Sequence, residues 1–537
     1  MLSPTRSNSS SPGPRTRLPR LAPGYRGHAA AALVALLVLL VPATGVAQVD
    51  PRVGTPLSLA EAEGRALDLN PQVLEARLAT EAADFTLLQR QAAFGTTFTT
   101  YLTERGQTSP ATSQLVGGSG VTTVSNDTTS FGTTLDKALP WGGGRVSLDF
   151  NNDRTSTSSL FANFNPSYAS GVAASYSQPL LRGFRIDQTR EQVQQARIDR
   201  GLTDVTVRQL MAQIRAAVQR AYWELAYAVG AVETTRRSRD LAQRQLEDNQ
   251  LRLELGTVTQ IDVLQSRAEV AARTQAVVQS EGTWRAAQTA LKQLIVADTA
   301  DPMWRATLVP ADSPQLAAPA VVDVDVATAR ALANRTDLQT LSRQRERLDL
   351  NLRLLEDQRR PAVDLNVGLS LNGVGGTQIL RSSSSLGGSG IGTVPGGYSD
   401  ALRTLTSVDY PVWTLGLSIS VPLSTSAADA AAARGTVERR QLDARRRTTE
   451  LQVAATITRL VDQVGNATLQ VESAAVAREL AEQRLELENA RLAVGLSTTF
   501  LVLQAQRDLT TSQTAELRAQ LDLRSALVDL EQAQEAP

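Results

Sequence analysis

One long phrase occurs twice in the sequence, and this repeat constrains the fold more than any other feature. The segment LRLELGTVTQIDVLQ at 251–265 matches ARLAVGLSTTFLVLQ at 490–504, with a fixed step of 239 residues (490 − 251) and no gap. The same step pairs residues on both sides of the phrase, such as Ala242 with Ala481, Leu246 with Leu485 and Leu291 with Leu530. Solenoid repeats have periods of about 20–50 residues. The sequence therefore predicts one long module used twice.

Residues 1–47 are predicted to form a secretory signal peptide. Five arginines precede an apolar run at 29–41, and Gly45-Val46-Ala47 fits a signal-peptidase site. A membrane anchor is the alternative, but a run of about 13 residues is shorter than the roughly 20 that a spanning helix needs. We therefore expect the mature chain to be exported from the cytoplasm.

Composition excludes most chemistry. The chain has no Cys, and its one histidine, His28, lies in the predicted signal peptide. Disulfides, lipoprotein acylation, Cys nucleophiles, His-based catalysis and ordinary zinc or copper sites are therefore excluded from the mature chain. Removing five arginines from 54 basic residues leaves 49 against 54 acidic ones, a net charge of −5, so no nucleic-acid partner is indicated. We expect no enzyme activity, no cofactor and no metal.

Each module begins with a short helix and a longer one. In the first, Ser58 is placed to cap a helix, and Asn70-Pro71 breaks it and restarts a second helix that runs to about Gln91. In the second, a helical region begins near Val326 and is stopped by Pro361.

The hydrophobic period then changes from 3.6 to 2. Apolar and polar residues alternate strictly at 363–371 and 413–421, and more loosely at 94–102 and 172–176. Such alternation predicts strands with one apolar and one polar face. Together with long Gly/Ser/Thr-rich stretches such as 373–409, it is typical of a transmembrane β-barrel. The edge of a soluble β-sandwich is the alternative, and the signal peptide favours the membrane.

Very long helices follow the strands. Neither 186–255 nor 424–494 contains a proline, and about 70 residues in a helix span on the order of 100 Å. Every seventh residue forms an apolar seam, interrupted at the same place by Arg239 and Arg478. A sustained seven-residue repeat requires a partner helix. We expect the two arginines to face water or a carboxylate rather than a ligand.

The repeated phrases are predicted to be tight turns at the far tips of two helical hairpins. Gly256 and Gly495 suit the left-handed position that ends a helix. The next helix, expected to run back to about Ile295 or Glu531, is then capped by a hydroxyl residue, either Thr257 or Thr259 in the first module and either Ser497 or Thr498 in the second.

The chain resembles the TolC-type outer-membrane efflux proteins from about Leu57 to Ala533. The marks are the duplicated module and three motifs, Asn70-Pro71, Gln178-Pro179-Leu180-Leu181-Arg182-Gly183, and Val494-Gly495-Leu496-Ser497 followed by Leu503-Gln504-Ala505-Gln506. The resemblance implies a homotrimer whose three chains supply twelve strands of one barrel. A physical argument agrees, because a sheet of about four strands leaves unpaired edges in lipid, and membrane barrels begin at about eight strands.

The predicted fold is an α+β membrane protein. We expect a trimeric outer-membrane β-barrel, with about four strands per chain, continuous with a long periplasmic α-helical coiled-coil barrel. The predicted domains are the signal peptide (1–47), the first helix–strand–strand–helix module (48–296), an equatorial linker (297–324) and the second module (325–537). An additional strand-like pair within 131–150 either extends the strands or enlarges the barrel.

The resemblance implies a passive export duct in a Gram-negative type of envelope. It implies an outer-membrane channel of a tripartite efflux or type I secretion system, opened by a periplasmic adaptor (membrane fusion protein) and an inner-membrane pump. A periplasmic coiled-coil protein without a pore is the alternative. The sequence leaves the cargo open among drugs, metals, siderophores and a secreted polypeptide.

Two sets of site residues follow. The tip residues expected to dock the adaptor are Leu255, Gly256, Thr257, Val494, Gly495, Leu496 and Ser497. The residues expected to line the aperture are Asp262, Gln265, Leu501 and Gln504. Asp262 is either a pore acid or simply a residue favoured at a helix start, and Leu501 is an alternative hydrophobic constriction. Positions that carry a bridging tyrosine and arginine in the family read Leu492 and Ser497, so the closed tip is expected to be held differently.

Overall fold

The computed structural model describes residues 50–111, 122–159, 161–312, 322–381, 390–424 and 426–534. The unit from Gly54 to Pro537 carries every helix and strand of these ranges. The predicted signal peptide, residues 1–47, lies outside the described residues. Within these ranges, none of the helices combines the length and the apolar character that crossing a membrane requires.

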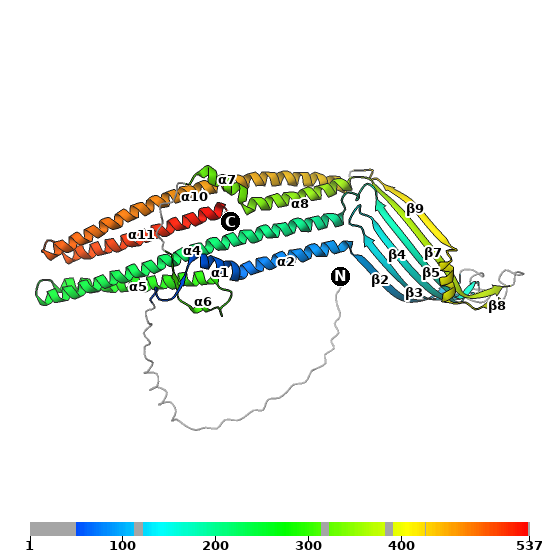
Figure 1. Ribbon diagram of the computed structural model, residues 1–537, viewed down its shortest axis with the longest axis horizontal. Coiled ribbons are helices and arrows are strands. Elements are labelled where there is room, and N and C mark those ends of the chain that lie inside the picture. The colour runs from blue at the N-terminus through cyan, green and yellow to red at the C-terminus, as the bar shows by residue number, and fades with distance from the viewer. Residues whose placement is uncertain are drawn as a thin grey trace, which may run out of the picture. The chain divides into compact units, whose positions relative to one another are not determined.

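The first module contains four strands between two pairs of helices (Figure 1). In chain order its elements are β1 (Thr55–Leu57), α1 (Leu59–Leu69), α2 (Pro71–Gln91), the short 3₁₀ helix η1 (Ala92–Phe94), β2 (Thr96–Pro110), β3 (Thr123–Ala138), β4 (Arg145–Thr157), β5 (Phe164–Pro179), α4 (Gln188–Glu254) and α5 (Gln260–Ile295).

The second module repeats this succession after a short connection that contains α6 (Pro302–Arg305) and β6 (Leu308–Pro310). Its elements are α7 (Val324–Asn334), α8 (Thr336–Gln358), β7 (Ala362–Arg381), β8 (Gly390–Val394), α9 (Tyr398–Thr406), β9 (Pro411–Ser420), α10 (Ala427–Ala493) and α11 (Thr499–Gln534). The duplication extends to helix length, because α4 and α10 both have 67 residues and α5 and α11 both have 36.

The first helices begin where the capping residues predict. The Ser58 hydroxyl accepts a hydrogen bond from the Glu61 backbone N–H at 3.2 Å, and the Asn70 side chain accepts one from the Gln72 N–H at 2.8 Å. Asn70 is buried, and its side-chain amide also donates to the Leu294 carbonyl at 2.9 Å. This one residue therefore starts α2 and fixes its first turn against the end of α5.

The long helices pack as two hairpins, α4 with α5 and α10 with α11, and α11 also packs on α4. The seven-residue seam is buried in both modules, at Val218, Leu225, Val232 and Leu246 of α4 and at Ile457, Val464 and Leu485 of α10. Close contact along a repeating apolar seam is what holds such long helices, because helices of this composition gain little from propensity alone.

A compact core lies near the middle of the helices, where β1 pairs in parallel with β6. Tyr222 of α4 is fully buried there, and its hydroxyl contacts the Leu57 carbonyl at 2.9 Å and the Asp312 carboxylate at 2.8 Å. Burial, with the nearby Asp312 charge adding to it, raises the pKa of Tyr222 to about 12. These contacts attach the chain that connects the modules to the first long helix.

Seven strands of the described residues form one antiparallel sheet, in the order β2-β3-β4-β5-β7-β8 with β9 also paired to β7. The expectation of about four strands per chain is therefore wrong. The additional pair consists of two full strands, β3 and β4, which pair from Asn126 with Thr157 to Ala138 with Arg145. On the face of the sheet that carries Leu135 and Leu148, these strands also have polar residues such as Thr133 and Asn152. The alternation is therefore interrupted, and the sequence pattern indicates shorter strands than the structure has.

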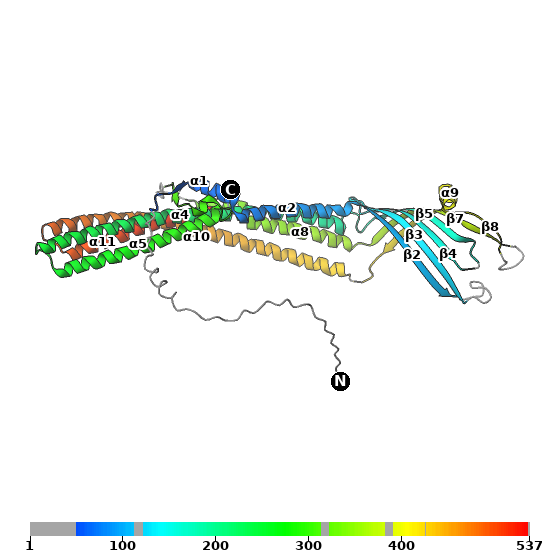
Figure 2. The ribbon, with the colours of Figure 1, turned by 90° about the horizontal axis from the view of Figure 1, so that it is seen from below.

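The strands alternate in direction, and the two edges of the sheet run oppositely (Figures 1 and 2). The β2 strand leads away from the helices after η1, and β9 returns to them before α10. The body of the sheet consists of six strands, β2, β3, β4, β5, β7 and β9. The five-residue β8 pairs only with the last part of β7.

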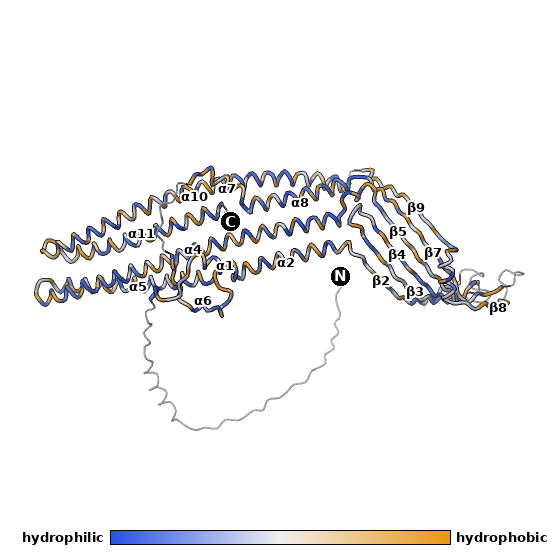
Figure 3. Tube along the Cα trace, viewed as in Figure 1, coloured by the Kyte–Doolittle hydropathy of each residue, from blue (hydrophilic) through white to orange (hydrophobic). Residues whose placement is uncertain are grey.

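The strand register shows a predominantly apolar face and a polar face of the sheet. Cross-strand neighbours on one face form an apolar row of Trp413, Leu369, Ala174, Leu148, Leu135 and Phe98. The adjacent row on the other face consists of Thr414, Gly368, Ser175, Ser147, Asp136 and Thr97. Figure 3 shows hydrophobic and hydrophilic residues interspersed along these strands. The predicted assignment of one apolar and one polar face is confirmed.

Candidate functional site at the helical tips

Both long hairpins turn through the same hydrogen-bonded motif, and their tips lie at the same end of the helices (Figure 1). Gly256 and Gly495 have φ values of +73° and +75°. In the first turn, the Thr257 N–H donates to the Arg252 carbonyl at 2.9 Å, and in the second the Leu496 N–H donates to the Arg491 carbonyl at 2.8 Å. This is the Schellman arrangement, in which a left-handed residue closes the helix end. The repeated phrases are therefore two copies of one turn.

The helices after the turns begin at the second of the two hydroxyl residues proposed for each. Thr259 precedes α5, and its backbone N–H and hydroxyl both donate to an Asp262 carboxylate oxygen, at 2.9 and 2.6 Å. The Leu501 N–H donates to the Thr498 hydroxyl at 3.4 Å at the start of α11. The hydrogen bonds from the Thr259 hydroxyl and N–H lower the pKa of Asp262. Asp262 is thus both a helix-start residue and a carboxylate that stays ionised.

The predicted docking residues are mostly exposed and include an apolar group. Leu255, Val494 and Leu496 have exposed fractions of 77%, 69% and 78%. Gly256, Thr257 and Gly495 are also exposed, and no atom lies within 4 Å of a Cβ built on either glycine. Ser497 is the exception, because it is half-buried and donates to the Glu488 carboxylate at 2.5 Å. A group of exposed apolar side chains is typical of a surface that binds another molecule.

The predicted aperture residues occupy equivalent places on α5 and α11. Asp262 is half-buried and Gln265 is exposed on α5. Leu501 is exposed and Gln504 half-buried on α11, where the Gln504 amide donates to the Asp508 carboxylate at 2.8 Å.

A charged contact between the modules lies about one helical turn further along both helices. The Glu269 carboxylate of α5 accepts from Arg507 of α11, through Nε at 3.0 Å and through Nη2, and from Arg273 Nε at 2.7 Å. The Glu269 side chain is only 5% exposed. Burial alone raises the pKa of Glu269, but the hydrogen bonds and charges of Arg507 and Arg273 outweigh it, so the pKa lies below its usual value. We call Glu269, Arg273 and Arg507 the inter-module clamp.

Sequence reasoning did not find this clamp, although the repeat contains a signal for it. The step of 239 residues pairs Glu269 with Asp508 (508 − 269), so both modules carry an acid at this position. Asp508 pairs with Arg484 of its own module at 2.9 Å. The partner of Glu269 comes from the other module, and a sequence pattern does not indicate which helices from separate modules become neighbours.

The two hairpins also differ in their internal polar contacts near the tip. In the first, the side-chain amide of the fully buried Asn249 donates to the Ser266 hydroxyl at 2.7 Å. The equivalent of Asn249 in the second module is Glu488, which accepts from Ser497. The tips therefore share a backbone conformation but differ in the side-chain hydrogen bonds that support it.

Comparison with known proteins identifies the fold. The sequence profile described as "Outer membrane efflux protein" matches residues 64–296 and 327–534. The chain belongs to this family. No curated protein sequence matches it.

Several solved channels share the fold of this efflux protein. The Campylobacter jejuni CmeC outer membrane channel has a TM-score of 0.63 at 12% identity, with 89% of this chain and 85% of that chain covered. The Vibrio cholerae outer membrane protein VceC has a TM-score of 0.60 at 17% identity, with 89% and 96% covered. The open state of the Neisseria gonorrhoeae MtrE outer membrane channel has a TM-score of 0.59 at 15% identity, with 89% of each chain covered.

Family membership places the chain in the outer membrane and among channels rather than enzymes. It decides against a periplasmic coiled-coil protein without a pore. The matched ranges, 64–296 and 327–534, correspond to the two modules. In the part of the chain that the structure describes, no group of three or more His, Cys, Asp or Glu side chains is arranged to hold a metal ion.

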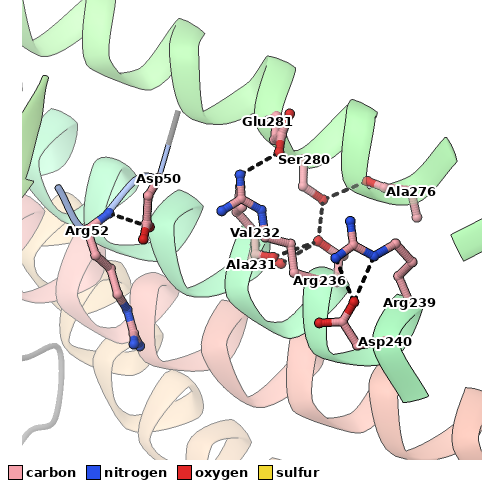
Figure 4. A network of polar contacts seen from close by, with 11 residues as sticks. Asp50, Arg52, Ala231, Val232, Arg236, Arg239, Asp240, Ala276, Ser280 and Glu281 are labelled. Atoms are coloured by element: carbon pink, nitrogen blue, oxygen red, sulfur yellow. Dashed lines mark hydrogen bonds and ion pairs between the residues drawn. The ribbon is translucent and has the colours of Figure 1, made fainter. Parts of the chain in front are cut away.

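Polar contacts in the middle of the first hairpin of this efflux protein are structural (Figure 4). Arg236 of α4 pairs with Glu281 of α5 at 2.6 Å, and Arg239 pairs with Asp240 at 2.6 Å. In the second hairpin, Arg478 pairs with Glu516 of α11 at 2.6 Å. The expectation that both seam arginines face water or a carboxylate is confirmed.

Proposed function

We propose that this efflux protein is the passive outer-membrane duct of a tripartite export system, opened at its helical tips by a periplasmic adaptor that couples it to an inner-membrane pump. The observation that carries the proposal is a sheet with one apolar face, one polar face and two edge strands, β2 and β9, connected to helices that end in two copies of one exposed turn. Such a sheet suits a wall between lipid and a wet lumen.

We propose that three chains close one barrel. The edge strands β2 and β9 run in opposite directions, so β2 of one chain can pair antiparallel with β9 of the next. Closure removes the unpaired N–H and C=O groups, each of which costs several kcal/mol in lipid. Three chains with six crossing strands each give eighteen strands (3 × 6) rather than the twelve that the resemblance implied. The barrel is then wider than that expectation, because diameter grows with strand number.

The tips are the proposed adaptor-docking sites. Three chains with two turns each present six similar surfaces, three built on Leu255-Gly256-Thr257 and three on Val494-Gly495-Leu496-Ser497. Their exposed leucines and valine supply apolar contact for a partner. A ring of six adaptor hairpins matches this number, with docking sites that alternate in chemistry.

The starts of α5 and α11 are the proposed aperture, with the inter-module clamp behind it. Asp262 and Gln265 would alternate around the pore with Leu501 and Gln504. Three ionised Asp262 carboxylates in a narrow pore attract cations. The clamp ties α5 to α11 next to these residues, so its release is a route to widening the aperture.

Assembly and docking are tested on the same protein. We expect the purified protein in mild detergent to have the mass of three chains by light scattering, and electron microscopy to resolve eighteen strands. Because the chain has no Cys, a single cysteine at Thr257 can carry a cross-linker and should capture a co-expressed periplasmic adaptor. A stable, well-folded monomer would overturn the trimer. The control for docking is a cysteine at Thr283, which is exposed in the middle of α5. If it captures as much adaptor as the cysteine at Thr257, docking at the tips is overturned.

A further inference from the structure

The helix α9 lies against the sheet at the end remote from the long helices (Figure 2). Its buried residues, Ala401 and Leu405, face β7 at Gly373 and Gly375. A Cβ built on Gly373 would lie 2.0 Å from the Ala401 carbonyl oxygen, and one built on Gly375 would lie 2.4 Å from the Ala401 nitrogen. The helix backbone therefore rests directly on the strand backbone, which only glycine permits at these positions.

The first residue of α9 reaches three other strands. The Tyr398 hydroxyl donates to the Asn152 side chain of β4 at 2.7 Å, and its ring centroid lies 6.0 Å from that of Phe131 on β3 and 6.3 Å from that of Tyr168 on β5. From β3 to β7 there are three strand spacings, about 14 Å. The turn of α9 at Ala401 and Gly397 lies over Gly375, and the next turn, from Ala401 to Leu405, lies over Gly373. The helix therefore follows β7, and the Tyr398 side chain extends from it across the neighbouring strands.

The strand register shows which face α9 covers. Gly373 lies two residues beyond Leu371 and therefore on the same, apolar face. Its cross-strand neighbours are Ser170 and then Asn152, both of which are buried beneath α9. The α9 helix thus sits on the outward face, over Ser170 and Asn152, two polar residues of that face.

The side of α9 that faces away from the sheet is polar, and apolar and aromatic residues border it. Ser399, Arg403 and Thr406 are exposed, and the Arg403 side chain is 80% exposed with Asp400 at 3.6 Å. The preceding and following segments expose Ile391, Val394, Tyr410 and Trp413. Tyr and Trp are typical of the boundary between hydrocarbon and headgroups.

We infer that α9 is a membrane-surface helix, which lies in the headgroup layer of the outer leaflet and places Arg403 among lipid phosphates. The inference rests on the proposed function, because it requires the apolar face of the sheet to meet lipid. Continuity selects lipid as the occupant of this face: on β7 the apolar outward residues end at Leu371, and α9 covers the next row with a polar outer side. On β3 and β2 the same row stays apolar, with Phe131 and Leu102 exposed.

The absence of Cys makes the position of α9 measurable with single nitroxide labels. We would attach labels at L369C, S370C, S399C, R403C and T257C in separate variants, and reconstitute each in phosphatidylethanolamine–phosphatidylglycerol vesicles. Accessibility to oxygen and to a water-soluble nickel chelate would then report depth. We expect oxygen to dominate at L369C, the chelate to dominate at S370C and T257C, and both α9 labels to lie between these limits, shifting towards oxygen on transfer from detergent to vesicles.

The outcomes separate this inference from the proposed function. If L369C and S370C do not differ, the sheet does not separate lipid from lumen and the proposed function fails. If they differ but the α9 labels behave as T257C does, only the position of α9 is overturned. As a second test, Gly373→Val should dislodge α9 and make S399C more accessible to the chelate. Gly368→Val, on the polar face of the same strand, should leave S399C unchanged, because a Cβ there meets only Thr414 at 3.7 Å.

Discussion

At the scale of single residues, Glu269 combines a buried charge with two partners from different helices. Burying a carboxylate is costly unless it is paired and hydrogen-bonded, and losing one partner of such a group costs far more than losing a surface pair. Arg273 belongs to the same helix as Glu269, whereas Arg507 belongs to the other module. The Glu269 carboxylate therefore links α5 of the first module to α11 of the second.

Glu269→Gln should loosen that link. The amide keeps the size of the side chain but removes the charge that both arginines share, so we expect a higher single-channel conductance in planar bilayers. Glu281→Gln is the matched control, because Glu281 pairs with Arg236 inside one hairpin. Equal conductance of the Glu269 and Glu281 variants would show that the clamp does not restrain the aperture.

The same clamp predicts a pH dependence. The pKa of Glu269 lies below the ordinary value of 4.5, so its ionisation stabilises the folded contact. This stabilisation is fully present above pH 4.5 and is lost as the pH falls through the lower, folded-state value. We expect conductance to rise on acidification below about pH 4.5 in the native protein. It should rise much less in the Glu269→Gln variant, and parallel curves for the two proteins would contradict the assignment.

Asp262 and Leu501 test the aperture itself. Asp262→Asn should reduce the preference for cations, and Leu501→Asp should increase it, because three like charges change the potential of a narrow pore. If Leu501 instead gates by dewetting, Leu501→Ser should raise conductance by itself. Reversal potentials and single-channel currents measure both effects. Unchanged values in all three variants would leave Asp262 with only its role at the start of α5, beside Thr259.

At the scale of elements, the tip turns depend on backbone conformation rather than on space. A residue with a Cβ in the left-handed region costs roughly 1–2 kcal/mol, and a β-branched one is the least suited to it. Gly256→Val and Gly495→Val should therefore reshape the turns and abolish export, while trimers still reach the membrane. Gly465→Val in α10 is the control, because that glycine also has free space but no positive φ. Export assays and membrane fractionation measure the two outcomes.

Local signals account for the elements that the sequence predicted. Caps and breakers are contained in a few adjacent residues, which is why Ser58, Asn70 and Pro361 marked real helix ends. The tip turns were predictable for the same reason, since Gly256 and Gly495 specify a left-handed residue by themselves.

Elements that depend on distant partners were missed. The strands β3 and β4 lack strict alternation because polar residues such as Asn152 face outward beneath α9, where the Tyr398 hydroxyl donates to the Asn152 side chain. The α9 helix lies in a stretch rich in glycine and serine, and its burial depends on Gly373 and Gly375 of a different element. The inter-module clamp joins residues 238 positions apart, beyond the reach of any periodicity.

At the scale of the whole molecule, the two faces of the sheet predict opposite tolerances. Leu369→Arg and Leu417→Arg place a charge on the apolar face, which costs about 2–4 kcal/mol at the middle of the bilayer. They should reduce the amount of trimer in the membrane. Ser370→Arg and Ser418→Arg, one residue along each strand, should leave assembly intact and change conductance. Quantitative membrane fractionation measures the first effect, and equal losses in all four variants would reverse the assignment of the faces.

The hairpin formed by β3 and β4 also bears on how such a protein can change over evolutionary time. Because it adds two strands of opposite direction inside the first module, the directions of β2 and β9 at the edges are the same as they would be without it. A single inserted strand would make the outer edges run alike, and neighbouring subunits could no longer close in the same pattern. Duplication or loss of a whole hairpin is therefore the smallest heritable step open to this sheet. In an assembly of three, the circumference can then grow or shrink only by six strands at a time, while the helical half of each module stays as it was.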